Sequence, residues 1–164
     1  MRKKTIEDYV ELLYMLEQEQ SPVHTNTVAQ AFAITPASVT EMFQKLDGED
    51  YIHYERYTGV TLTLKGKRLA RATQQKHDIL KQFLMLIGVD EKTADTDACR
   101  IEHIVTPRTL KKLTKFVEFA EQEHGHARWL DHFLYYDKTG KYITCTPQTQ
   151  QQCPVHGKHK RQDK

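Results

Sequence analysis

The apolar positions at the start of the chain recur every three or four residues, and this spacing predicts helices. The first helix is expected to begin with a capping pattern at residues 5–8 and to run to about Gln18. Its apolar positions are Ile6, Tyr9, Val10, Leu13 and Leu16. The pair Ser21-Pro22 then interrupts the pattern. A short helix should follow, with its apolar face at Val28, Ala29 and Phe32.

A tight turn at residues 33–35 is expected to separate this short helix from the next one. Thr35 suits the N-cap position, where a side-chain oxygen accepts a hydrogen bond from the backbone, and Pro36 suits the first helical position. The apolar residues that follow at helical spacing are Val39, Met42, Phe43 and Leu46. Two short helices joined by a turn of about three residues are typical of a helix-turn-helix.

Beyond residue 48 the apolar spacing changes from helical to alternating. Ile52 and Tyr54 alternate with polar residues, as do Val60 and Leu62, and a turn falls at residues 57–59. This pattern predicts a β-hairpin directly after the second helix of the helix-turn-helix. The N-terminal unit is therefore expected to be a winged helix-turn-helix in a mainly α-helical chain.

Helical spacing returns after the hairpin. The chain should form a helix of about 24 residues from Thr63 to Gly88, and a fifth helix from residues 89–90 to the Thr106-Pro107 pair. A sixth should end at about Glu123, and one further short helix should surround residues 129–134.

These elements predict three domains. A winged helix-turn-helix domain would occupy residues 1–72, and a helical domain would occupy residues 73–136. The segment 137–164 is rich in polar residues with little to bury, and it is expected to be a flexible tail.

Composition and charge narrow the class of protein. With 38% hydrophobic and 28% charged residues and no long apolar run, the chain is expected to be soluble and cytoplasmic, without a membrane partner. Three cysteines do not make a disulfide framework and suit a reducing compartment. The net charge is only +2, but the stretch from Arg56 to Lys76 contains six Lys or Arg and no acid. This stretch is a candidate surface for DNA phosphates.

Candidate metal ligands lie in three separate pieces of the sequence, one of which is His77 in the middle of the long helical segment. On a continuous helix, Cys99, Glu102 and His103 would share one face because they stand at positions i, i+3 and i+4. Asp8 and Glu11 have the same spacing in the first helix. Thiols, carboxylates and imidazoles bind first-row transition metals. The residues alone also allow a plainer interpretation, in which the cysteine packs in the core and the charged residues are solvated.

The ordered set of motifs resembles the diphtheria-toxin-repressor family of metal-dependent regulators, and within it the manganese transport regulators. The resemblance rests on residues 7–11, 38–40, 44–46, 57–63, 76–77 and 99–103. It implies a homodimer, formed by the helical domain, that represses metal-uptake genes by binding double-stranded DNA operators. It also implies that the chain lacks the C-terminal SH3-like domain of longer members.

The resemblance further implies a set of metal ligands. By position they are Asp8, Glu11, His77, Glu102 and His103, with Cys99 as a departure. Manganese regulators mostly carry a glutamate where Cys99 stands, whereas the iron-responsive branch carries a cysteine there and a methionine in place of Asp8. The cofactor is therefore expected to be Mn²⁺ or Fe²⁺, with two ions per subunit if Glu11 bridges them. Without metal, the repelling carboxylates would loosen the contact of the first helix with the fourth and fifth.

The candidate DNA contacts lie at the start of the second helix of the helix-turn-helix and on the basic stretch. They are Thr35, Pro36, Ala37, Ser38, Thr40 and Glu41, with Arg56, Lys65 and Lys67 facing the phosphate backbone. A carboxylate such as Glu41 can accept a hydrogen bond from cytosine N4, or it can simply point away from the groove.

Two other functions compete with this interpretation. Oxidation of Cys99 could make the chain a thiol-responsive regulator, or a cluster of His, Glu and Cys could make it a small metalloenzyme. The second is disfavoured because the sequence lacks a glycine-rich loop and a nucleophile elbow, so we expect neither enzyme activity nor a small organic substrate. Metal-ligand residues also occur in the tail, at Cys145, Cys153, His156 and His159. Their spacing matches no recognised zinc motif and favours adventitious metal pickup.

Overall fold

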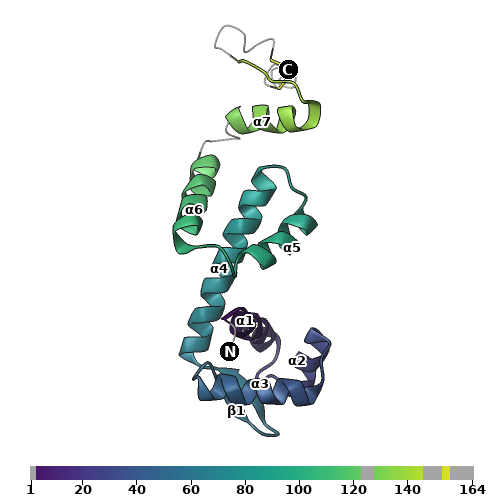
Figure 1. Ribbon diagram of the computed structural model, residues 1–164, viewed down its shortest axis with the longest axis vertical. Helices are drawn as coiled ribbons and strands as arrows, with labels where there is room; N and C mark the ends of the chain where they lie inside the picture. Colours follow the sequence, from purple (N-terminus) through teal and green to yellow (C-terminus); the bar gives the residue numbers. More distant parts are fainter. Residues whose placement is uncertain (1–2, 123–127, 146–152, 156–164) are drawn as a thin grey trace, which may run out of the picture. The chain divides into compact units, whose positions relative to one another are not determined.

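The computed structural model describes residues 3–122, 128–145 and 153–155. The elements are α1 (Lys3–Glu19), α2 (Thr25–Phe32), α3 (Pro36–Gly48), β1 (Ile52–Glu55), β2 (Gly59–Leu62), α4 (Leu64–Leu86), α5 (Glu91–Ile101), α6 (Pro107–Gln122) and α7 (Arg128–Thr139), in that order (Figure 1). The mainly α-helical class is confirmed. Within these residues, every helix is too short or too polar to cross a membrane.

The chain divides into two compact units. The first comprises Met1–Asp78 together with Cys99–Val105, and the second comprises Ile79–Ala98 together with Thr106–Lys164. Helix α4 contributes residues to both. This division by contacts differs from a simple cut along the sequence, because the last residues of α5 and the turn after it belong with the N-terminal elements.

The predicted turn between α2 and α3 is present. Ala33 ends α2 with a left-handed conformation (φ 54°), and its N–H donates to a carbonyl of the last helical turn. Thr35 is the N-cap of α3, where its hydroxyl accepts a hydrogen bond from the backbone N–H of Ser38. Pro36 occupies the first turn. These local preferences explain why the helix-turn-helix forms where the sequence indicates it.

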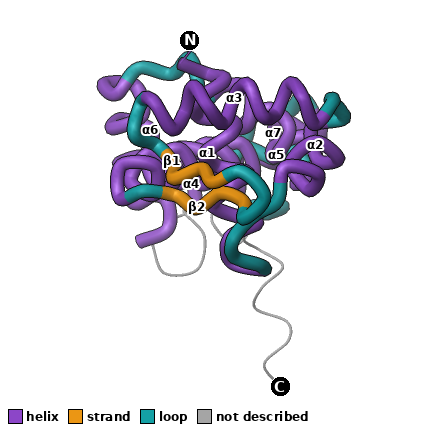
Figure 2. Tube along the Cα trace, turned by 90° about the horizontal axis from the view of Figure 1, so that it is seen from below, coloured by secondary structure: helices purple, strands orange, loops and turns teal. Residues whose placement is uncertain are grey.

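The wing is the antiparallel hairpin of β1 and β2, drawn in orange in Figure 2. Ile52 pairs with Leu62, and the hairpin is also tied to the loop before α2 through a bridge between Val23 and Val60. Gly59 has a φ of +123°, and a Cβ there would lie 2.7 Å from the carbonyl oxygen of Val23. Only glycine allows these two segments of the chain to approach each other this closely.

A single hydrophobic core holds the winged unit together. Its fully buried members come from α1, α2, α3 and both strands, and include Val10, Leu13, Val28, Phe43, Leu46, Ile52 and Val60. Because α1 and α3 contribute residues to the same close-packed core, the position of one helix constrains that of the other.

The second unit has an aromatic contact of its own. The ring of Phe116 on α6 makes edge contacts with Phe83, at 5.8 Å between centroids, and with Trp129, at 5.5 Å. Buried residues of α5, α6 and α7 pack in this unit, among them Ala94, Ala98, Val117 and Leu130.

Three details of the expected helices are wrong. Helix α1 already includes Lys3, so residues 5–8 lie inside the helix and do not form its cap. Helix α5 ends at Ile101, which places Glu102 and His103 in the turn that follows. Helix α7 extends to Thr139, beyond the expected start of the tail. The expected end of α6 near Glu123 and the break at 124–126 fall outside the described residues.

Candidate metal centre and nucleic-acid interface

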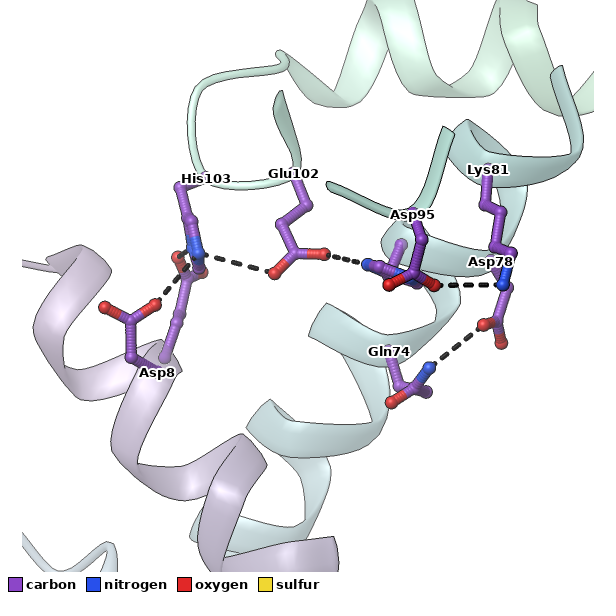
Figure 3. A network of polar contacts seen from close by, with 9 residues as sticks. Asp8, Gln74, Asp78, Lys81, Asp95, Glu102 and His103 are labelled. Carbon is purple, nitrogen blue, oxygen red and sulfur yellow. Dashed lines mark hydrogen bonds and ion pairs between the residues drawn. The ribbon is translucent and has the colours of Figure 1, made fainter. Parts of the chain in front are cut away.

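Carboxylates and an imidazole from distant parts of the sequence converge in the first unit. Nε2 of His103 lies 3.0 Å from Oδ1 of Asp8 on α1 and 3.3 Å from Oε1 of Glu102. Figure 3 shows Asp8 pointing toward His103 across the gap between α1 and the turn after α5. Glu102 and His103 lie in this turn, and not on a helical face with Cys99 as the sequence predicted.

His77 of α4 extends the cluster. Its Nδ1 lies 3.0 Å from Oε2 of Glu102, so the Glu102 carboxylate stands between two imidazole rings. Glu102 is buried, with 1% of its surface exposed. The cluster therefore joins α1, α4 and the turn after α5 through polar side chains that are largely withdrawn from water.

Two buried atoms in this cluster are suited to bind a cation. Oε1 of Glu102 and Nε2 of His103 have no hydrogen-bond partner among the residues that the structure describes. A buried polar atom left unpaired costs about 1–3 kcal/mol, and more if the group is charged. Both atoms are of the kinds that ligate metal ions, and together with Asp8 they would be satisfied by one cation between them.

Two acids of the cluster, Glu102 and Glu11, have raised pKa values. Burial, together with the negative charge of Glu11, raises the pKa of Glu102 to about 7. Burial also raises the pKa of Glu11, although the positive charges of His77 and His103 oppose the shift. Buried carboxylates with raised pKa values are common at functional sites. The shifts agree with a site built for a cation.

Glu7 is a part of the site that sequence reasoning missed. Its Oε2 lies 3.0 Å from Nδ1 of His103, and its Oε1 accepts a hydrogen bond of 3.2 Å from Lys76. Burial raises the pKa of Glu7, but the hydrogen bonds with His103 and Lys76 outweigh it and keep this pKa below its usual value. An ionised Glu7 can accept a hydrogen bond from Nδ1–H of His103, and a ring held in this tautomer presents Nε2 to a metal. The only sequence signal for this role was that Glu7 is an acidic residue directly after Ile6, which belongs to the apolar face of the helix.

Cys99 lies on α5 and is exposed. Partial desolvation raises its pKa, and the negative charges of Glu102, Glu11 and Asp8 raise it further. The thiol therefore belongs to the electrostatic neighbourhood of the cluster but stays protonated at neutral pH. A protonated thiol is a poor nucleophile, which weighs against a regulator that responds to oxidation of Cys99.

The candidate DNA surface is exposed and concave. Thr35, Pro36, Ala37 and Ser38 at the start of α3 are exposed, as is Glu41, while Thr40 is half-buried and donates to the Pro36 carbonyl. A hollow of about 710 Å³ lies between the helix-turn-helix and the wing, and is lined by His24, Thr25, Asn26, Pro36, Thr40, Gln44, Tyr54, Arg56 and Tyr57.

The three candidate phosphate contacts differ in their present partners. Arg56 lies on the exposed wing, with its guanidinium 5.3 Å from the ring centroid of Tyr57. Lys65 donates to the carbonyl of Glu49 at 2.6 Å, and Lys67 forms an ion pair of 2.9 Å with Glu17. Each ammonium has three N–H donors, so Lys65 and Lys67 can also reach a phosphate while they keep these partners.

The fold and the site together define a winged helix-turn-helix protein with a cluster of acids and imidazoles suited to a divalent metal ion. Comparison with known proteins agrees with this class. Residues 1–60 match the N-terminal DNA binding domain of iron dependent repressors, and residues 63–130 match the metal binding and dimerisation domain of the same family. The chain belongs to this family, and it is a metal-dependent DNA-binding transcriptional regulator and not an enzyme.

Individual relatives fit the same picture. The chain is 38% identical to the HTH-type transcriptional regulator MntR of Bacillus subtilis over 128 residues, which cover 78% of this chain and 90% of that protein. It is 37% identical to MntR of Bacillus velezensis over 130 residues, covering 79% and 92% of the two chains. The structure of the manganese regulator SloR is similar, with a TM-score of 0.60 and 28% identity over 70% of this chain and 54% of that chain. The expected resemblance to manganese regulators is confirmed.

Proposed function

We propose that the chain is a repressor of metal-uptake genes that binds its operator when Mn²⁺, or alternatively Fe²⁺, occupies the cluster described above. The proposed ligands are Asp8, Glu11, His77, Glu102 and His103, with Cys99 at the margin. The observation that carries the proposal is the pair of buried atoms without a hydrogen-bond partner, Glu102 Oε1 and His103 Nε2, which lie 3.3 Å apart beside the Asp8 carboxylate.

The donor set favours manganese over softer metals. Carboxylate oxygens suit Mn²⁺, and imidazoles suit iron and zinc as well. Cys99, the one soft donor, is exposed at the margin of the cluster, and the other proposed ligands offer oxygen or nitrogen. The similarity to regulators named for manganese supports the same choice.

A bound divalent cation supplies positive charge to a cluster whose carboxylates otherwise repel one another. Asp8 holds α1 to this point, His77 holds α4, and Glu102 with His103 hold the turn after α5. Helix α1 shares its apolar core with α3, through residues such as Leu13 and Phe43. When the cluster is neutralised, the position of the recognition helix is therefore fixed more tightly relative to the start of α4.

This restriction supports DNA binding by a dimer. In the proposed homodimer, two recognition helices must reach successive major grooves about 34 Å apart, or a multiple of that spacing. A firmly held winged unit loses less conformational freedom when it docks, so metal and operator strengthen each other's binding. Such a regulator would act in the cytoplasm, where the promoters of uptake genes are accessible.

The test is the affinity of the purified protein for a duplex taken from upstream of its own gene. We expect Mn²⁺ and Fe²⁺ to raise this affinity and a chelator to abolish the gain, with Zn²⁺ less effective. His77→Ala should lose the response, whereas Gln75→Ala, an exposed change on the same helix, should keep it. A duplex affinity that is equal with metal and with chelator would overturn the proposal, and release by a thiol oxidant alone would favour regulation through Cys99.

The DNA face has a test of its own. Arg56→Ala should weaken binding to all duplex sequences alike and reduce the slope of log affinity against log salt by about 1. A loss confined to one sequence would show instead that Arg56 reads bases.

A further inference from the structure

We propose that the second unit contains a separate metal site, formed by His132, Cys145 and Cys153, that takes Zn²⁺. One donor atom from each of these residues lies within 4.8 Å of the other two. The site lies outside the Mn²⁺ cluster, and it does not depend on the function proposed above.

The spacing of the donors suits a tetrahedral site. Zn–S bonds of about 2.3 Å and Zn–N bonds of about 2.0–2.1 Å place neighbouring ligand atoms roughly 3.6–3.8 Å apart. Nε2 of His132 and Sγ of Cys153 are 3.5 Å apart, which is close to this value. The remaining separations need to shorten by about 1 Å at most to reach the same geometry.

Burial sets these residues apart from an ordinary surface cluster. Cys153 is 4% exposed, and His132 and Cys145 are half-buried. All three cysteines of the chain are thiols and not disulfides. A free cysteine is often buried as a small apolar residue, so the second thiol and the imidazole nearby are what single out this group.

The path of the chain explains how His132 and Cys145 meet. Helix α7 presents His132 and ends before Gly140, whose φ of +65° turns the chain. The following residues Tyr142 and Ile143 line a hollow of about 520 Å³ together with Trp129, His132, Phe133 and Tyr136 of the helix. The segment after Gly140 therefore lies against α7 and brings Cys145 to His132, a meeting that the spacing from Cys145 to Cys153 does not reveal.

The donor chemistry selects a different metal from that of the first cluster. Two thiolates and one imidazole favour Zn²⁺ over Mn²⁺, which prefers oxygen ligands. Binding requires both thiols to release their protons to solvent, so metal uptake would acidify an unbuffered solution. The bound ion would hold the segment after α7 against the aromatic residues of that helix. A fourth donor, from water or protein, would complete the tetrahedral coordination.

The experiment uses the full chain, reduced and metal-free, titrated with Co²⁺ and then with Zn²⁺. We expect the absorption bands of tetrahedral Co²⁺ and a thiolate charge-transfer band, both abolished by the double change Cys145→Ser with Cys153→Ser and weakened by His132→Gln. Cys99→Ser should keep the bands, and so should His53→Gln, which changes an exposed histidine of β1. Zn²⁺ retained against a competing chelator should fall by about one equivalent per chain in the double variant.

Several results would overturn the proposal. Thiolate bands that disappear in Cys99→Ser but persist in the double variant would place the metal at the first cluster. Retention of the same amount of Zn²⁺ in every variant would show adventitious binding, and a Cys145–Cys153 disulfide in reducing buffer would show a covalent clasp in place of a metal site. Far-UV circular dichroism, together with Mn²⁺ binding at the first cluster, establishes that each variant is folded.

Discussion

Glu102 offers the sharpest test of the idea that the cluster binds a cation but lowers the stability of the metal-free protein. It is buried, it faces His103 with an unsatisfied oxygen, and burial with the charge of Glu11 raises its pKa to about 7. Glu102→Gln removes the charge and keeps the shape. We expect the variant to be more stable than the wild type without metal and to gain less from added metal.

The magnitude follows from the pKa. Glu102 ordinarily titrates at 4.5 and does so at about 7 in the folded chain, so between these pH values the folded state holds a proton that the unfolded state has released. The stability of the metal-free wild type therefore falls as the pH rises through this window and levels off above it. The difference of about 2.5 pKa units (7 minus 4.5) corresponds to at most about 3 kcal/mol, because Glu11 titrates in the same cluster.

The assay is urea unfolding followed by circular dichroism at fixed protein concentration. In chelator at about pH 8, Glu102→Gln should unfold with a free energy up to about 3 kcal/mol higher than the wild type, and the difference should vanish near pH 4. With Mn²⁺ at about 100 times its dissociation constant, the wild type should gain about 2.7 kcal/mol and the variant less.

Glu19→Gln, an exposed change at the end of α1, is the control and should alter neither value. A Glu102→Gln chain that is less stable than the wild type in chelator at high pH would refute the reasoning.

Three further outcomes are expected. Glu7→Gln should weaken Mn²⁺ binding about 10- to 100-fold in calorimetric titrations, because Glu7 orients His103, while saturating Mn²⁺ should restore full DNA affinity. Mn²⁺ affinity should fall as the pH is lowered through about 7, since Glu102 then takes up a proton that competes with the metal, and this dependence should be shallower in Glu102→Gln. Gly66→Ala should lower the free energy of unfolding by about 1–3 kcal/mol or more, measured with urea, because the added Cβ would collide with the Tyr51 carbonyl.

Local sequence patterns were sufficient to predict the winged helix-turn-helix. The Thr35 cap, Pro36 in the first helical turn and the change from helical to alternating spacing at Ile52 are each determined by neighbours in the sequence. Such features survive in the folded chain because local preference and the shared core agree. The expected cap at residues 5–8 failed because α1 continues through it, and neighbouring apolar residues give no warning of that.

The site was harder to predict because its geometry is tertiary. We expected Cys99, Glu102 and His103 to share a helical face. These residues do lie near one another, but α5 ends at Ile101, and the turn that follows sets the directions of Glu102 and His103. Glu7 shows the same limit. Its role depends on contacts with His103 and Lys76, which are 96 and 69 residues away, and no spacing rule within one helix contains that information.

The central claim is that metal binding at the cluster and DNA binding by α3 are coupled, and reciprocity tests it most directly. The Mn²⁺ affinity of the wild type is measured with and without a saturating duplex from upstream of its own gene, and the duplex affinity with and without saturating Mn²⁺. The account requires both affinities to rise by the same factor, in the usual range of about 5- to 150-fold, and requires the factor to fall to one in His77→Ala. A Mn²⁺ affinity that is unchanged by bound DNA would contradict it.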